Sequence, residues 1–189
     1  MTLFSYVVEH DTGLAPNPEN NVCTLVYCKY KRRKSNHKNI VELAKKDDWI
    51  IGTGGKNKEK SAGHGTIIYI MRVDETLPFR EYLRRFPDRS YSKKHGKNAL
   101  VSHTFAYYGR QAILVEKIPG ANLVHLEKKG PGFRNKLPPT FIRQLADWIH
   151  KQHPSGKIGE PCAPDPDRIA EKRCRCPESK RGESKRGRR

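Results

Sequence analysis

Two consecutive turns near the N-terminus carry the first side chains that could do chemistry. Asp11 begins the turn Asp11-Thr12-Gly13, and Asn17 lies between two prolines in Ala15-Pro16-Asn17-Pro18. Because proline fixes the backbone angle φ, the second turn could hold the Asn17 amide ready to read a polar ligand. Asp and Asn are also ordinary turn formers, and composition alone favours that structural interpretation.

A basic segment with interleaved tyrosines follows these turns. Cys28 lies next to Lys29 and close to Lys31, whose charges would lower the pKa of its thiol and activate it as a nucleophile. A buried, unreactive cysteine is the commoner alternative. The run Lys29–Lys34 combines cations that bind phosphate with rings that stack on bases, and Lys29 is its first phosphate-binding candidate. A solvated basic loop explains this run equally well.

Two later segments supply further binding candidates. The stretch Ser102–Arg110 holds hydroxyls, a histidine and aromatic rings, so Ser102 could bind the edge of a base while Tyr107 stacks on its face. Packing of these rings in the core is the alternative. In the loop between Lys129 and Arg134, two glycines bracket a proline, which lets the backbone approach a ligand closely. Lys129 and Arg134 therefore predict phosphate binding there.

The cysteine and histidine patterns predict no metal site. The five cysteines form no regular C-x₂-C pair, and the histidines are scattered along the chain. No paired-carboxylate, zinc-protease or nucleophile-elbow motif is present. The sequence identifies no cofactor.

The composition favours a polyanionic partner. The 189 residues include 38 Lys and Arg against 20 Asp and Glu, which gives a net charge of +18 and a pI near 9.9. Nucleic acid is the commonest polyanion that such a protein binds. Residues 1–156 carry +13 of this charge and residues 157–189 carry +5, so the basic character is not confined to the C-terminus.

One folded domain followed by a basic tail is expected. Residues 1–159 fit a single domain, because domains usually contain about 100–200 residues. Residues 160–189 combine charges and prolines with almost no apolar residue after Ile169, so we expect disorder there. The tail would serve either phosphate contact or solubility alone.

The chain shows no signal for a membrane or for secretion. Its longest apolar run, Ile67–Met71, is far shorter than the ~20 residues of a membrane helix. The N-terminus lacks the basic start and apolar segment of a secretory signal. An odd number of cysteines also argues against a disulfide scaffold, so we expect a cytoplasmic protein with reduced thiols.

The pattern of apolar residues predicts an α+β fold. Strand patterns occupy Leu3–Val8, Val22–Lys29, Asp48–Gly52, Thr66–Val73, Leu100–Val101 and Ala112–Val115. Helix patterns occupy Leu77–Phe86 and Thr140–Gln152, and the segment Phe105–Gly109 reads as an aromatic turn. We therefore expect a small, curled or barrel-like, mostly antiparallel sheet with a few flanking helices.

The order of these motifs resembles a known prokaryotic and phage family. The N-terminal motifs are Ser5-Tyr6-Val7-Val8, Asp11-x-Gly13-x-Ala15-Pro16-Asn17-Pro18, Cys23-Thr24-Leu25 and Cys28-Lys29. The later ones are Asp48-Trp49-Ile50-Ile51-Gly52, Tyr69-Ile70-Met71-Arg72-Val73, Ser102-x-x-Phe105-x-Tyr107-Tyr108-Gly109-x-x-Ala112 and Gly130-x-Gly132-x-Arg134. Over residues 3–148 the chain is similar to the second type of nucleotide-modification-associated domain, whose members are often labelled DNA base hypermodification proteins.

A second resemblance exists at the level of the fold alone. An acidic–aromatic–apolar strand like Asp48–Gly52 precedes a long strand like Ile67–Val73 in the barrels of PUA, EVE and ASCH domains. Those domains read modified bases in RNA or DNA. This resemblance implies a barrel-like sheet and a pocket for a modified base.

Three hypotheses for function result. In the first, implied by the family, the protein acts in the synthesis of a hypermodified nucleobase, as an enzyme in which Asp11 or Cys28 is the reactive group. The base or nucleotide would be bound by Asn17, Ser102 and Tyr107, and phosphate by Lys29, Lys129 and Arg134. In the second hypothesis the protein is a non-catalytic reader of modified bases, and in the third it is a basic accessory protein that binds nucleic acid without base preference. The expected partners are DNA, with RNA as the alternative, and other enzymes of a base-modification pathway.

Overall fold

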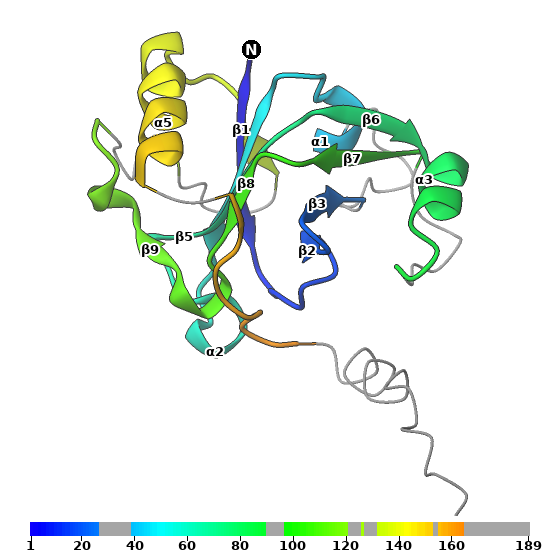
Figure 1. Ribbon diagram of the computed structural model, residues 1–189. Helices are drawn as coiled ribbons and strands as arrows, with labels where there is room; N and C mark the ends of the chain where they lie inside the picture. The colour runs from blue at the N-terminus through cyan, green and yellow to red at the C-terminus, as the bar shows by residue number, and fades with distance from the viewer. Residues whose placement is uncertain (27–38, 90–96, 121–125, 127–131, 153–154, 165–189) are drawn as a thin grey trace, which may run out of the picture.

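Two β-sheets and the helices packed around them make up the molecule, shown as a computed structural model in Figure 1. The structure describes residues 1–26, 39–89, 97–120, 126, 132–152 and 155–164. The larger sheet has seven strands in the order β10-β1-β4-β5-β8-β11, with β9 also pairing with β5. Its strands are β1 (Leu3–Val8), β4 (Trp49–Gly54), β5 (Thr66–Arg72), β8 (Phe105–Tyr107), β9 (Ile113–Leu114), β10 (Phe133–Arg134) and β11 (Gly156–Lys157).

The smaller sheet has four antiparallel strands in the order β2-β3-β7-β6. Its strands are β2 (Asn17–Glu19), β3 (Val22–Leu25), β6 (Glu75–Pro78) and β7 (Asn98–Ser102). From β1 to β8 the chain passes between the sheets four times, and two of these crossings, from β5 to β6 and from β7 to β8, lie next to each other. Asp74 joins these two crossings, because its carboxylate accepts hydrogen bonds from the Arg72 side chain and from the backbone N–H of His103.

Short helices and one long helix connect the strands. The α-helices are α1 (Ile40–Leu43), α2 (Lys58–Ser61), α3 (Phe79–Arg85) and α5 (Pro139–Gln152), and the 3₁₀ turns are η1 (Gly109–Gln111) and η2 (Val115–Lys117). Asn39 caps α1 in a capping box with Glu42, and the Asn57 side chain accepts hydrogen bonds from the first N–H groups of α2. None of the described helices has the length and apolar character needed to cross a bilayer.

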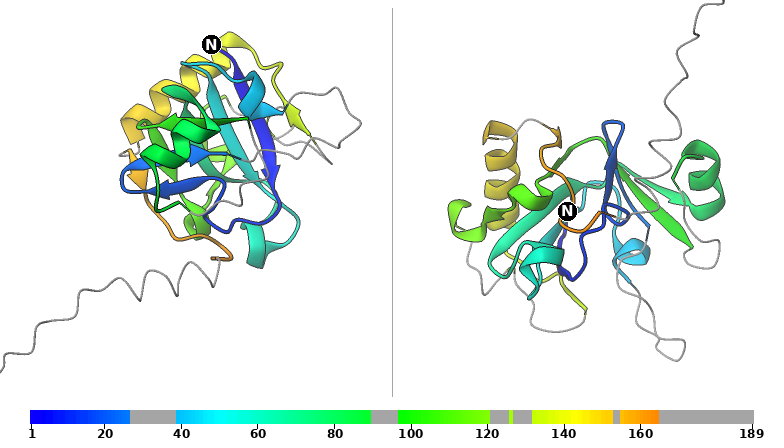
Figure 2. Two further views of the ribbon diagram at one scale, coloured as in Figure 1. Left: turned by 90° about the vertical axis from the view of Figure 1, so that its right-hand side faces the viewer. Right: turned by 90° about the horizontal axis from the view of Figure 1, so that it is seen from below.

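The two sheets divide the core into three layers. On β4, Trp49 and Ile51 point towards α5, whereas Ile50 points towards the smaller sheet, as the alternation of a strand requires. The space between the sheets is filled by side chains of both, among them Leu25 and Leu100. A third cluster joins the outer face of the smaller sheet to α3, so α5 and α3 lie on opposite sides of the molecule (Figures 1 and 2).

The predicted α+β class is confirmed, and most predicted elements are present. The prediction was wrong for Phe105–Tyr107, which forms a strand and not a turn. It also missed β2, which contains Pro18. Because β2 is the edge strand of its sheet, no further strand needs the hydrogen bond that proline cannot donate. Neither described sheet is closed into a barrel, so the barrel-like alternative of the prediction was wrong.

The described chain extends five residues into the predicted tail. Residues 160–164 are described, and Pro161 and Cys162 are buried against the domain. The rest of the predicted tail, 165–189, lies outside the described residues, so its expected disorder stays a prediction.

Candidate functional site

Asp11 links four parts of the molecule. Its side chain is completely buried. The Tyr107 hydroxyl donates to Oδ1 at 2.5 Å, and the backbone N–H of Cys162 donates to Oδ2 at 3.0 Å. In the main chain, the Asp11 N–H donates to the carbonyl of Lys60, and the Asp11 carbonyl accepts from Ala163. The turn after β1 is thereby joined to β8, to α2 and to the C-terminal segment.

Burial controls the ionisation of this cluster. It raises the pKa of Asp11, although the hydrogen bonds from Tyr107 and Cys162 act in the opposite direction. Burial, and then the charge of Asp11, raise the pKa of the Tyr107 phenol and raise that of the Cys162 thiol to about 11. Tyr107 and Cys162 therefore stay protonated at neutral pH and act as hydrogen-bond donors to the carboxylate.

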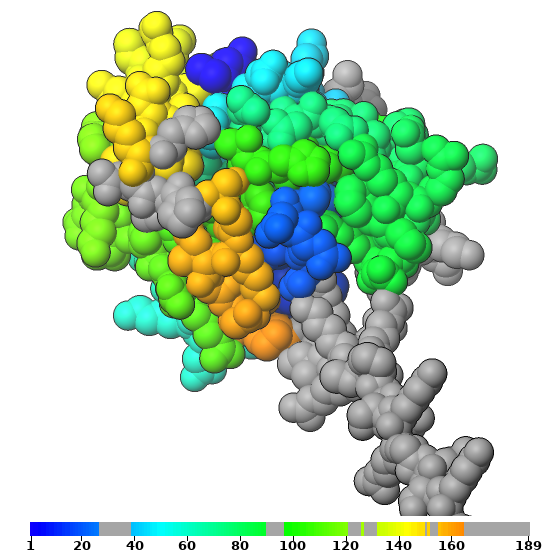
Figure 3. Space-filling model, in the orientation of Figure 1, coloured from blue at the N-terminus to red at the C-terminus, as the bar shows by residue number. Residues whose placement is uncertain are grey.

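The residues 156–164 lie across the edge of the molecule as a strap. Gly156 and Lys157 pair with β8, and the Lys157 ammonium forms ion pairs with Glu19 of the β2–β3 hairpin and with Glu160. Figure 3 shows this strap, in orange, lying on the surface beside the blue β2–β3 hairpin. The Arg110 guanidinium donates to two strap carbonyls, those of Pro161 at 3.0 Å and Cys162 at 3.1 Å. Cys162 and Ala163 of the strap form hydrogen bonds with Asp11, so the strap covers this residue.

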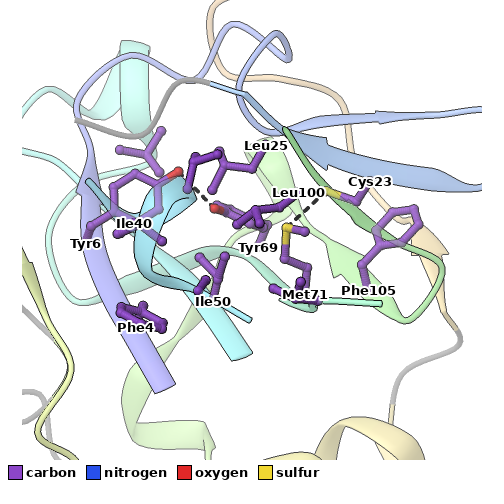
Figure 4. Packing of buried hydrophobic residues seen from close by; sticks show 14 of the residues in the cluster. Phe4, Tyr6, Cys23, Leu25, Ile40, Ile50, Tyr69, Met71, Leu100 and Phe105 are labelled. Atoms are coloured by element: carbon purple, nitrogen blue, oxygen red, sulfur yellow. Dashed lines mark hydrogen bonds between the residues drawn. The ribbon is translucent and has the colours of Figure 1, made fainter. Parts of the chain in front are cut away.

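Tyr107 belongs to a row of tyrosines across the larger sheet. Tyr6, Gly52, Tyr69 and Tyr107 occupy consecutive paired positions on β1, β4, β5 and β8. Because Gly52 has no side chain, the Tyr69 ring can lie over β4, where a β-carbon would overlap it. The Tyr6 and Tyr69 hydroxyls then share a hydrogen bond of 2.9 Å, drawn in Figure 4. The row packs as core, and Tyr107 presents its hydroxyl to Asp11.

Asn17 and Ser102 lie on either side of β3 in the smaller sheet. Asn17 is paired with Thr24, and Ser102 with Cys23. Paired residues share a face and successive residues alternate, so the two side chains face opposite sides of this sheet. The Ser102 hydroxyl donates to the Thr104 carbonyl and accepts from the Thr104 N–H, which shapes the crossing from β7 to β8. Both residues are buried.

Arg89, which sequence reasoning missed, fixes the hairpin that carries Asn17. Its guanidinium is buried and donates to the carbonyls of Asn17, Glu19 and Val22 and to the Thr24 hydroxyl. It also lies 4.8 Å from the centroid of the Phe86 ring. A single arginine in a polar stretch carries no pattern that predicts such a contact, because its partners lie about 70 residues away in the sequence.

The predicted residues are thus only partly brought together. Asp11 and Tyr107 are in direct contact. Arg134 lies on the edge strand β10, four strand spacings from Tyr107, which is about 19 Å along the sheet. Cys28, Lys29 and Lys129 lie outside the described residues, so their roles stay predictions. Cys162 was not predicted as part of the site, since it stood in the expected tail.

Metal ligation was tested against the same geometry. Within the described part of the chain, no group of three or more His, Cys, Asp or Glu side chains is placed to hold a metal ion. Cys162 and Tyr107 contact Asp11 as hydrogen-bond donors, together with the backbone N–H groups of Gly13 and Cys162. The arrangement can hold a proton and orient a carboxylate.

Comparison with known proteins gives one match. The family model described as nucleotide modification associated domain 2 matches residues 1–97 and 88–166. These two overlapping matches include every described residue. No curated protein and no solved structure matches the chain.

Proposed function

Because this chain belongs to the nucleotide modification associated domain 2 family, we propose that it acts in the synthesis of a hypermodified nucleobase and works on nucleic acid. The observation that carries the proposal is the extent of the family match, which reaches from β1 through the strap. The net charge of +18 supports a polyanionic substrate, with DNA favoured over RNA. Other enzymes of the same modification pathway are the further partners that we propose.

Asp11 is the reactive group that we propose among the described residues. A buried carboxyl with a raised pKa is suited to holding and transferring a proton. The Tyr107 hydroxyl orients it at 2.5 Å. The strap covers the carboxyl, so the reaction requires the strap to move and the base to take the place of the Cys162 N–H. Cys28 stays the alternative reactive group.

The binding residues are assigned in the same proposal. Asn17, on the α3 side of the smaller sheet, binds the base or nucleotide, and Ser102 and Tyr107 act from the space between the sheets. Lys29, Lys129 and Arg134 hold phosphate. Since Arg134 is distant from Tyr107 along the sheet, its phosphate belongs to a neighbouring nucleotide of a polymer and not to the base at Asp11.

Nucleoside analysis tests this proposal. Total DNA and RNA are digested from cells with the gene, without it, and with the gene restored as wild type or as Asp11→Asn, and the nucleosides are identified by mass spectrometry. We expect a modified nucleoside that disappears without the gene, returns with the wild type and does not return with Asp11→Asn. Asp147→Asn, on the exposed side of α5, is the control and restores it. Identical profiles in all cells would overturn the proposal.

A reader of modified bases is the second candidate. One observation favours it: each described polar candidate except Arg134 is buried, and Asp11 and Ser102 use their side chains to hold neighbouring backbone in place. A reader binds a modified oligonucleotide more tightly than the plain one and tolerates Cys28→Ser. A thiol enzyme loses its activity with this substitution.

A further inference from the structure

Basic side chains of the described surface differ in whether acidic groups neutralise them. Lys157 has Glu160 at 2.7 Å, and Arg85 has Glu75 at 2.6 Å. The hydrogen bond to Glu75 raises the pKa of Arg85, and the charge of Glu81 acts in the same direction. Glu75 of β6 and Glu81 of the first turn of α3 therefore both interact with Arg85.

The remaining cations around α3 are not neutralised in this way. Arg80 and Arg84 are exposed and stand four residues apart, so they lie on the same side of the helix. Lys97 is also exposed, and its carbonyl accepts a hydrogen bond from the N–H of Phe79, which brings its backbone to the start of α3. None of these three forms an ion pair with another described residue. We call Arg80, Arg84 and Lys97 the α3 face.

Two segments of the sequence close to α3 contain no acidic residue. Residues 27–38 include six Lys and Arg and residues 90–96 include two, with no Asp or Glu in either segment. The first segment follows Val26, which packs with Phe79 and Tyr82 of α3, and the second lies between Arg89 and Lys97. Eight further cations thus belong to segments that are joined in the sequence to Val26, Arg89 and Lys97.

The α3 face is also rigidly connected to the hairpin of Asn17. Phe86, which follows α3, has the Arg89 guanidinium over its ring, and that guanidinium binds the Asn17 carbonyl at 3.2 Å. The Tyr82 hydroxyl of α3 shares a hydrogen bond with Thr24, the strand partner of Asn17. A ligand bound on this face would therefore be placed without a large ordering cost.

From these observations we infer that the α3 face is the docking surface for the phosphate backbone of a nucleic acid. Exposed guanidinium and ammonium groups without acidic partners are the chemistry that backbone phosphates require. The choice of nucleic acid as the partner rests on the proposed function. The inference adds where the polymer lies: on the outer side of the smaller sheet, away from α5.

Salt-dependent binding of the full-length protein tests this inference. The test variant is Arg80→Gln/Arg84→Gln/Lys97→Gln. The control is Lys117→Gln/Arg143→Gln/Lys151→Gln, which removes three exposed cations on the side of η2 and α5. Fluorescence anisotropy gives the affinity for labelled single-stranded and duplex oligonucleotides of DNA and of RNA between 50 and 200 mM salt. Each phosphate contact releases about 0.9 counterions from a duplex and about 0.7 from a single strand.

We expect the slope of log affinity against log salt to fall by about 2 to 3 in the α3 variant and to change little in the control. For a duplex, the loss of affinity across this salt range then becomes smaller than that of the wild type by a factor on the order of 40. Both variants should keep the thermal midpoint of the wild type, since surface substitutions rarely change stability by more than about 0.5 kcal/mol.

Three results would overturn the inference. Equal losses in both variants would mean that the general positive charge binds nucleic acid, and an unchanged α3 variant would place the contact elsewhere. Absence of wild-type binding at 50 mM salt, together with binding of anionic phospholipid vesicles that the α3 variant loses, would assign the face to a membrane surface. The nucleoside profile is measured separately. Failure of the inference about the α3 face can therefore be distinguished from failure of the proposed function.

Discussion

At the scale of single residues, Asp11 stabilises the fold because its two carboxylate oxygens accept hydrogen bonds from the Tyr107 hydroxyl and the Cys162 N–H. In Asp11→Asn, the amide oxygen can still accept from Tyr107, but the amide NH₂ then faces the N–H of Cys162. An unsatisfied buried donor costs about 1–3 kcal/mol, so we expect the free energy of unfolding to fall by about 2 kcal/mol at pH 7. Urea denaturation measures it, with Asp147→Asn on the exposed side of α5 as the unchanged control.

The stability of the wild type and of Asp11→Asn should also depend differently on pH. Burial raises the pKa of Asp11 in the folded protein above its ordinary value of 3.8, so the folded state binds the proton more tightly than the unfolded chain. This contribution to stability is complete below pH 3.8, and it is lost as the pH rises through the raised pKa. The stability difference between wild type and Asp11→Asn should therefore widen between pH 7 and about 4. A difference that narrows on acidification would contradict the assignment.

Gly52 is the second residue with a sharp expectation. A β-carbon there would lie 2.5 Å from Cδ1 of Tyr69 and 2.7 Å from Cγ2 of Val8, within a strand that cannot shift easily. We expect Gly52→Ala to lower the free energy of unfolding by about 3 kcal/mol. At Gly55 the nearest atoms are 3.2 Å away, so Gly55→Ala should cost less than about 1 kcal/mol. Urea denaturation of both variants checks this order, and equal costs would refute the role of the tyrosine row.

At the scale of elements, the strap is held by polar contacts whose opening can be measured. Arg110→Ala removes the donors to the Pro161 and Cys162 carbonyls and should favour local opening about tenfold. Alkylation of Cys162 by iodoacetamide reports this opening, because the side chain of Cys162, a residue of the strap, is buried against the domain when the strap is closed. Cys23, buried between the sheets, is the internal reference.

The alkylation experiment needs a background without other reactive thiols, so Cys28, Cys174 and Cys176 are first replaced by Ser. Arg143→Ala, an exposed arginine of α5, is the matched control and should leave both rates unchanged. Equal acceleration at Cys162 and Cys23 would indicate global unfolding, and no acceleration at Cys162 would mean that Arg110 does not hold the strap.

Sequence patterns predicted the elements whose periodicity is strong and failed where packing decides. Thr66–Arg72 and Pro139–Gln152 were found within one residue because one is continuously apolar and the other amphipathic. Phe105–Tyr107 was predicted as a turn because three residues are too few to show alternation. All three are buried in the structure. Asp11 could be selected from its turn, but its partner Cys162 lies 151 residues away, and no local pattern carries a contact of that range.

At the scale of the whole molecule, the α3 face is separated from the two larger apolar clusters by the smaller sheet. The larger apolar clusters lie on both faces of the seven-stranded sheet, whereas the α3 face lies beyond the smaller sheet. The strap ties these regions together, since Lys157 contacts the β2–β3 hairpin while Cys162 and Ala163 contact the turn after β1. The folded domain should therefore end after the strap.

Two truncated chains test where the domain ends. A chain of residues 1–164 retains every contact of the strap and should unfold at the same urea midpoint as the full chain. A chain of residues 1–159 leaves Asp11 without the N–H of Cys162 and Arg110 without its two acceptors, so its free energy of unfolding should fall by about 3 kcal/mol. Adding Arg110→Ala should destabilise 1–164 but have little further effect on 1–159, because the acceptors of the guanidinium are already absent. Equal stability of the two chains would instead place the end of the domain at residue 159, as the composition alone predicts.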